Sequence, residues 1–154
     1  MNRPITLRRA QPEDANAIAA LVSEAYSPYI PRIGRKPGPM LDDYAQVLTD
    51  SIVFVCMDDA RIVGVLVMRL EGTEMLLLNV AVLPRCKGQG VGKRLMVFCE
   101  DYARRKGCIA VRLYTHERMS ENLRIYRKSG YVETHRATEH GFARVFMCKP
   151  LPVG

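Results

Sequence analysis

The stretch Leu76–Arg94, LLLNVAVLPRCKGQGVGKR, determines how the rest of the chain is interpreted. Its first half is a run of apolar residues interrupted by Asn79, and its second half places Gly88, Gly90 and Gly92 among basic residues. N–H groups at the start of a helix have no intrahelical partner, and the helix dipole adds partial positive charge there. Glycines let the backbone approach an anion and take dihedral angles that a Cβ forbids. The stretch therefore predicts a buried strand, an anion-binding turn and a helix.

Composition indicates a globular protein. The 154 residues suffice for one sizeable core, and we expect a single domain over residues 1–154. The net charge of +7 favours an anionic partner, which a phosphate-bearing cosubstrate satisfies. Zinc-finger spacing, an RNP-like aromatic strand and a long basic arm are missing from the sequence, so nucleic acid is not the expected partner. The sequence contains no signal-peptide pattern and no apolar run of membrane-spanning length, so we expect a cytoplasmic protein without a membrane partner.

The cysteines and histidines do not indicate a metal site. The five cysteines are Cys56, Cys86, Cys99, Cys108 and Cys148. They are odd in number and include no CxxC, which argues against a disulfide framework or a zinc site. Four fall in apolar patterns and are expected in the core, whereas Cys86 in the glycine-rich turn is the candidate exposed thiol. His116, His135 and His140 lack metal-ligand spacing and are expected on the surface or in loops.

Hydrophobic periodicity predicts the order β α α β β β α β α β β. The expected strands are Ile5–Arg8, Ile52–Met57, Ile62–Leu70, Met75–Leu83, Ile109–Tyr114, Tyr131–Thr134 and Phe142–Cys148. The expected helices follow Pro12, Leu41, Gly90 and Met119. The fold class is α/β (α+β), with a mixed central sheet of about seven strands, one right-handed parallel crossover and helices on both faces. The uniformly apolar strand Met75–Leu83 should be central and covered on both faces.

Residues 27–40, SPYIPRIGRKPGPM, contain four prolines and two glycines and are predicted to be an irregular loop. Two interpretations remain open. The segment is either a surface connection or a lid over a second substrate, since long loops in compact domains often carry function.

Two nucleotide-binding motifs are excluded for the glycine-rich turn. In a Walker A loop, Lys87 would occupy the place of the first glycine and Arg94 the place of the hydroxyl residue that binds magnesium. The dinucleotide fingerprint G-x-G-x-x-G also fails, because the spacing here is Gly88, Gly90 and Gly92.

The turn resembles instead the central motif of the GCN5-related N-acetyltransferase (GNAT) superfamily, Arg/Gln-x-x-Gly-x-Gly/Ala. The matching residues are Lys87-Gly88-Gln89-Gly90-Val91-Gly92, after the strand residues Asn79-Val80-Ala81-Val82-Leu83-Pro84. Lys87 departs from the usual arginine or glutamine and keeps the charge without the planar fork. Downstream, Asn122 to Tyr131 (NLRIYRKSGY) resembles the family's Asn…Tyr-x-Lys-x-Gly-Phe/Tyr signature. The two motifs have the family's order and separation, and they imply the acyl-CoA N-acyltransferase fold.

The resemblance implies acetyl-CoA as cosubstrate and no metal. The residues that it assigns to cosubstrate binding are Val80, Ala81, Val82, Lys87, Gly88, Gln89, Gly90, Val91, Gly92, Lys93, Asn122 and Tyr126. Val80 and Val82 would bind pantetheine through backbone hydrogen bonds, and the Val80 amide would polarise the thioester carbonyl. Asn122 is alternatively an exposed helical residue.

The resemblance also implies catalytic residues. Tyr126 matches the tyrosine that protonates the leaving thiolate in many members, although it also continues an apolar stripe and is alternatively a core residue. Glu74 is the candidate general base, alternatively a solvated turn residue, and many members use water. Asn79 needs a partner for its amide, either backbone at the splay of the strand or a substrate-bound water.

The implied reaction is acetyl transfer to a primary amine in a ternary complex. Tyr29, Arg32 and Arg35 are the expected acceptor-binding residues. The positive charges of Arg32, Arg35 and Lys36 suggest a small anionic amine, while a protein amine stays open. The alternative is a non-catalytic acyl-CoA-binding sensor or interaction module. A homodimer is an open possibility, with the strand Phe142–Cys148 as the candidate contact edge.

Overall fold

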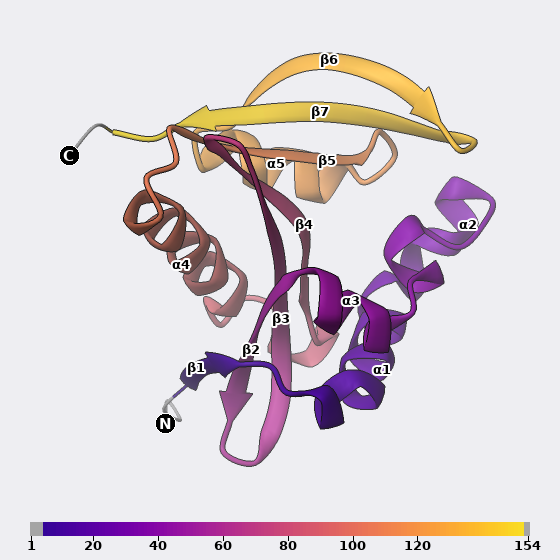
Figure 1. The fold of residues 1–154 in the computed structure, drawn as a ribbon. Coiled ribbons are helices and arrows are strands. Elements are labelled where there is room, and N and C mark those ends of the chain that lie inside the picture. Colours follow the sequence, from indigo (N-terminus) through magenta and orange to yellow (C-terminus); the bar gives the residue numbers. More distant parts are fainter. Residues whose placement is uncertain (1–4, 153–154) are drawn as a thin grey trace. The chain divides into compact units, whose positions relative to one another are not determined.

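The computed structural model describes residues 5–152, whose strands and helices follow the expected order with one additional short helix (Figure 1). The strands are β1 (Ile5–Arg9), β2 (Ile52–Asp58), β3 (Arg61–Glu71), β4 (Glu74–Val82), β5 (Ala110–His116), β6 (Val132–Glu139) and β7 (Phe142–Pro150). The α-helices are α1 (Ala15–Tyr26), α2 (Ile30–Ile33), α3 (Tyr44–Asp50), α4 (Val91–Arg105) and α5 (Ser120–Lys128). Short 3-10 helices are η1 (Pro12–Asp14), η2 (Ser27–Tyr29), η3 (Gly38–Leu41) and η4 (Pro84–Cys86).

The strands form one mixed sheet in the order β1-β2-β3-β4-β5-β7-β6. Strands β1 and β2, β2 and β3, β5 and β7, and β6 and β7 pair antiparallel. Strands β4 and β5 are parallel, in a register that joins Glu74–Leu77 to Ala110–Leu113. The central position predicted for β4 is confirmed. Its residues alternate between buried and half-buried, so only one of its faces is fully covered, in contrast to the expectation.

The chain divides into two compact units, each with its own part of the core. Within the described residues, the first unit comprises residues 5–68 and Asn79–Cys99, and the second comprises Arg69–Leu78 and residues 100–152. Among the helices of residues 5–152, none has the length and apolar character needed to cross a membrane.

Gly64 lets the first turns of α4 pack closely on β3 in the first unit. A Cβ at Gly64 would lie 3.0 Å from Val91 Cγ1, 3.0 Å from Leu95 Cδ1 and 3.3 Å from Cys56 Cβ. All three neighbours are buried. The missing side chain at Gly64 therefore sets how close α4 lies to the strand, and with it the place where the glycine-rich turn ends.

The segment after α1 is more regular than predicted. Instead of an irregular loop, residues 27–40 contain η2, α2 and most of η3. Each of these short helices has a proline in its first turn, where the fixed φ of proline suits a helix and its missing N–H costs nothing. The prolines thus start short helices here rather than break structure.

Strand β6 is longer than predicted. The predicted strand ended at Thr134, but β6 continues to Glu139, and a two-residue turn at His140 and Gly141 joins it to β7 (Figure 1). Both turn residues have positive φ, +52° and +81°, as a tight hairpin turn requires. Because β6 lies at the edge of the sheet and is mostly exposed, it lacks the apolar alternation that marks a strand in sequence.

We expect Gly64→Val to lower the free energy of unfolding by about 1–3 kcal/mol, because the new side chain would overlap Val91 and Leu95. Urea unfolding followed by circular dichroism measures the difference. Gly38→Ala is the control, since a Cβ there would meet no described atom within 4 Å. Equal stability of Gly64→Val and the parent would contradict close packing of α4 on β3.

Candidate functional site

The turn between β4 and α4 has the backbone geometry of an anion-binding loop. Gly88 and Gly90 have φ values of +82° and +81°, in the region where a residue with a Cβ is strained. A Cβ built at either glycine would meet no atom of the described residues within 4 Å. These glycines are therefore required for the direction of the backbone, and the space beside them is open.

Helix α4 begins directly after this turn, at Val91. The Arg94 N–H donates to the Gly90 carbonyl oxygen over 3.0 Å, so helical hydrogen bonding starts from the second positive-φ glycine. The first N–H groups of a helix have no intrahelical acceptor and carry the positive end of the helix dipole. Lys87 and Lys93 are exposed on either side of the turn. Backbone and charge together fit a phosphate or pyrophosphate group.

Cys86, in the same turn, is buried rather than exposed, so the prediction of an accessible thiol there is wrong. The 3-10 helix η4 folds this part of the turn back on itself, because the Cys86 N–H donates to Leu83 O (2.8 Å) and the Lys87 N–H donates to Pro84 O (3.2 Å). The cysteine that is only half-buried is Cys148 in β7.

Asn79 is buried in β4 and forms hydrogen bonds with two tyrosines of the first unit. The Tyr26 hydroxyl donates to Asn79 Oδ1 over 2.7 Å and approaches the Val80 carbonyl oxygen at 3.4 Å. Asn79 Nδ2 donates to the Tyr44 hydroxyl over 3.2 Å, and that hydroxyl donates to the Pro39 carbonyl oxygen over 2.7 Å. The observed partners of the amide are thus side chains, neither of the two kinds considered from sequence.

The Tyr44 hydroxyl is kept in its neutral form. Burial raises the pKa of Tyr44 above its ordinary value and the negative charge of Asp42 adds to the rise, while the hydrogen bond from Asn79 opposes it. A phenol with a raised pKa keeps its proton at neutral pH. It can therefore donate to Pro39 while it accepts from Asn79.

Residues 27–43, between α1 and α3, are called the connecting segment below. Tyr29 of this segment is buried, and the Arg32 guanidinium lies over its ring at 5.3 Å from the centroid. Arg32, Arg35 and Lys36 are exposed around Gly34, which ends α2 with a φ of +86°. The acceptor-binding candidates therefore lie on one short stretch of the first unit.

In the second unit, α5 carries the two residues predicted from the downstream motif. Asn122 and Tyr126 are half-buried, whereas Leu123 is buried. The Tyr126 carbonyl accepts hydrogen bonds from the N–H groups of Ser129 (3.1 Å) and Tyr131 (3.0 Å), and the two tyrosine rings meet edge to face at 6.0 Å. The backbone of Tyr126 is therefore held by the turn that follows the helix.

Tyr131 is anchored in turn by a half-buried acidic partner, Glu100. Its hydroxyl donates to Glu100 Oε2 over 3.2 Å, and Lys149 Nζ donates to Glu100 Oε1 over 2.8 Å. Gly130 has a φ of +98°, and a Cβ there would lie 3.3 Å from Lys149 Cε. The Gly-Tyr pair of the downstream motif thus fixes the end of α5.

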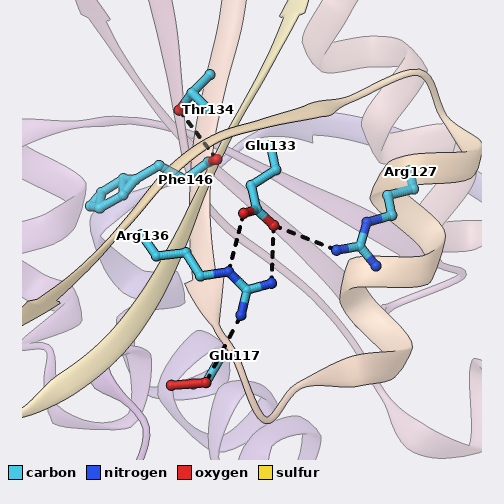
Figure 2. Close-up of polar contacts among 6 residues, drawn as sticks. All are labelled: Glu117, Arg127, Glu133, Thr134, Arg136 and Phe146. Atoms are coloured by element: carbon cyan, nitrogen blue, oxygen red, sulfur yellow. Dashed lines mark hydrogen bonds and ion pairs between the residues drawn. The ribbon is translucent and has the colours of Figure 1, made fainter.

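An ion-pair network supports the same end of α5. Figure 2 shows Glu133 of β6 between Arg136 and Arg127. The Glu133 carboxylate accepts hydrogen bonds from Arg136 Nε (3.1 Å) and Nη2 (3.0 Å). Arg127 Nη2 of α5 lies 3.6 Å from Glu133 Oε1. Arg136 Nη1 also lies 4.0 Å from Glu117 Oε2. The hydrogen bonds from Arg136 lower the pKa of Glu133. In the same figure, the Thr134 hydroxyl donates to the Phe146 carbonyl oxygen (3.2 Å) and ties β6 to β7.

Glu74, the predicted base, is the first residue of β4 and accepts a hydrogen bond from Arg112 of β5 over 3.1 Å. The Glu74 carboxylate is therefore part of a cross-strand ion pair within the second unit. His135 and His140 are exposed, as expected, and His116 is half-buried, with a pKa lowered chiefly by desolvation. No group of three or more potential metal ligands occurs in residues 5–152.

The predicted site residues fall into one group in each unit. The first unit holds the glycine turn, residues 79–82 and the connecting segment; the second holds Glu74, Asn122 and Tyr126. Sequence reasoning missed Tyr26 and Tyr44. The available signal was Asn79 itself, since a polar residue in an apolar strand needs partners.

Solved structures with the same fold include several N-acetyltransferases. A PaiA N-acetyltransferase from Thermoplasma acidophilum, in complex with coenzyme A, has a TM-score of 0.80 at 18% identity, over 96% of this chain and 99% of that one. The ribosomal-protein-S18-alanine N-acetyltransferase of Escherichia coli has a TM-score of 0.81 at 16% identity, over 98% and 96%. Ard1 from Thermoplasma volcanium has a TM-score of 0.76 at 22% identity, over 97% and 99%.

These structural likenesses show the fold. No curated protein matches the sequence. The sequence profile described as "Acetyltransferase (GNAT) domain" matches residues 49–133, which include β2 to α5 with both motifs. Since this match covers more than half of the chain, the protein belongs to the GNAT acetyltransferase family and is an acyltransferase enzyme.

Proposed function

We propose that this enzyme transfers an acetyl group from acetyl-CoA to a primary amine by direct attack in a ternary complex. The observation that carries the proposal is the turn in which Gly88 and Gly90, both at positive φ, lead from β4 into α4. In a member of the GNAT family, this geometry suits the pyrophosphate of coenzyme A. The coenzyme A bound to the PaiA N-acetyltransferase supports the same cosubstrate.

The cosubstrate-binding residues extend on both sides of this turn in the proposal. The N–H groups of residues 88–93 hold the pyrophosphate, and Lys87 and Lys93 supply positive charge. Val80, Ala81 and Val82 bind the pantetheine arm through their backbone, and Asn122 adds a contact from α5. The conformation at Gly88 and Gly90 and the open space beside them support the first part of this assignment.

Acetyl-CoA supplies an activated acyl group as a thioester. The Val80 N–H polarises the thioester carbonyl, the amine nitrogen bonds to its carbon, and the carbon–sulfur bond breaks as Tyr126 donates its proton to the leaving sulfur. Because Glu74 is held by Arg112, we propose that the amine loses its proton through water rather than to a dedicated carboxylate.

The acceptor is proposed to bind beside the connecting segment, where Tyr29, Arg32 and Arg35 lie. The exposed guanidinium groups favour an amine that also carries a carboxylate or phosphate. A protein amine is the second candidate, since the Escherichia coli enzyme with the same fold is named for a ribosomal-protein substrate.

We expect Tyr126→Phe to lower kcat by at least about a hundredfold with little change in KM for acetyl-CoA, because only the proton donor is lost. Thiol release from acetyl-CoA across a panel of amines measures both constants. Tyr114→Phe, at an exposed position of β5, is the matched control. Undiminished turnover by Tyr126→Phe would remove this residue from the mechanism, and no thiol release by the parent with any amine would refute the proposed reaction.

Gly90→Ala should raise the Kd for acetyl-CoA about tenfold, because alanine at a φ of +81° costs about 1–2 kcal/mol and relief of this strain turns the N–H groups away. Isothermal titration calorimetry measures the affinity. Gly72→Ala, at a φ of +61° in the turn between β3 and β4, introduces similar strain outside the proposed site. An equal loss of affinity in both variants would contradict the assignment.

Replacing Arg32 and Arg35 with alanine should raise KM about fivefold for amines that carry a carboxylate or phosphate and leave KM for neutral amines unchanged. Steady-state kinetics on matched anionic and neutral amines tests this, with Arg61→Ala as a control for lost positive charge. A uniform change for all amines would show that the two arginines do not select charge.

A further inference from the structure

One amide of β4 meets the residues at both ends of the connecting segment. Tyr26 is the last residue of α1, directly before the segment, and Tyr44 is the first residue of α3, directly after it. Their hydroxyls lie 2.7 Å and 3.2 Å from the two polar atoms of the Asn79 side chain. The segment is thereby closed as a loop whose two ends share a single partner.

A third contact reaches the interior of the segment. The Tyr44 hydroxyl donates to the carbonyl oxygen of Pro39, within η3, over 2.7 Å. Helix α1 packs against both η3 and α3. The chain of hydrogen bonds therefore continues from α1 through β4 and α3 into η3, inside the segment.

The network is buried, which makes each of its bonds costly to lose. The exposed fractions of Tyr26, Tyr44 and Asn79 are 7%, 5% and 7%. A polar atom that loses its partner at such a site is not rescued by bulk water, so the penalty exceeds that for an exposed hydrogen bond.

The direction of each hydrogen bond requires an amide at position 79. The Tyr44 hydroxyl donates a hydrogen bond to the Pro39 carbonyl oxygen and must therefore accept a hydrogen bond from Asn79 Nδ2. The Tyr26 hydroxyl donates to Asn79 Oδ1. An aspartate accepts at both oxygens and would compete with Pro39 for the Tyr44 proton, and a leucine offers neither function. Asparagine supplies one donor and one acceptor on a side chain short enough to stay in the strand.

We infer that Asn79, Tyr26 and Tyr44 are positioning residues that hold the connecting segment in one conformation against β4, so that the acceptor amine meets a preformed surface rather than a mobile lid. The inference rests on the proposed function in one respect, since that proposal assigns the segment to the acceptor. Holding the segment before the acceptor arrives removes an ordering cost from acceptor binding.

Tyr26→Phe and Tyr44→Phe test the inference, because each removes one hydroxyl and keeps the ring. Amide hydrogen exchange measured by mass spectrometry should become about tenfold faster in peptides from residues 27–43 and stay unchanged in β2 and β3. KM for the acceptor should rise about tenfold while KM for acetyl-CoA stays constant. Tyr114→Phe, on an exposed strand face, is the matched control and should change neither quantity.

Asn79→Leu extends the test to the shared partner. Adding Tyr26→Phe to Asn79→Leu should cause little further acceleration of exchange, because the hydrogen bond between Tyr26 and Asn79 is already lost. If Asn79→Leu does not fold, the two phenylalanine variants decide the question alone. Unchanged exchange in residues 27–43 of both phenylalanine variants would overturn the inference, and so would an equal rise in KM for both substrates.

The exchange measurement separates the inference from the proposed function. If the parent protein releases no thiol with any amine, the proposed function fails, while exchange in residues 27–43 still decides whether the three side chains hold the segment. If the parent is active and exchange does not respond, the proposed function stands and the inference fails.

Discussion

The start of α4 is constrained from two directions, and the geometry of the turn proposed to bind the cosubstrate depends on both. Gly64 removes the side chain that would separate β3 from Val91 and Leu95, so the helix lies directly on the strand. On the other side, Gly88 and Gly90 take backbone conformations that other residues adopt only with strain. Between these points the chain must leave β4, turn, and present N–H groups at the first helical turn. Close packing below the helix thus sets where the anion-binding turn is placed.

Asn79 shows how a buried polar group can organise its surroundings. In an apolar strand its amide costs free energy unless both of its polar atoms are paired. Two tyrosines satisfy it, one from each end of the connecting segment. A requirement of the core thereby determines the conformation of a segment that carries exposed arginines. Under the proposed function, the same three side chains couple packing of the core to binding of the acceptor.

The sequence predicted the fold well where the signal was strong and local. The order of elements, the central position of β4 and the GNAT family follow from apolar periodicity and two motifs, and all three are confirmed. The short helices of the connecting segment were missed because proline was interpreted as a breaker, although it also starts helical turns. The end of β6 was missed because an exposed edge strand has no apolar alternation.

The candidate site was predicted less completely than the fold. The glycine turn is visible in sequence because its residues are adjacent, whereas Tyr26, Tyr44 and Asn79 are far apart in the chain and meet only in the folded first unit. The burial of Cys86 depends on η4, which proline initiates, and no periodic pattern reveals it. The catalytic role of Tyr126, the single-domain organisation of residues 1–154 and a homodimer stay predictions, whereas water replaces Glu74 and a positioning role replaces the catalytic one of Asn79 in the proposals above.

The burial of the cysteines limits their reaction with the thiol product of the proposed reaction. The proposed reaction releases one thiol with every turnover, and an added oxidant can join such a thiol to an accessible cysteine as a mixed disulfide. Cys56, Cys86, Cys99 and Cys108 are enclosed in the core, and burial raises the pKa of the half-buried Cys148, which lowers its share of the reactive thiolate. The chain is therefore poorly suited to form mixed disulfides with its product, and a thiol-detecting reagent should report the product over a small background from the enzyme.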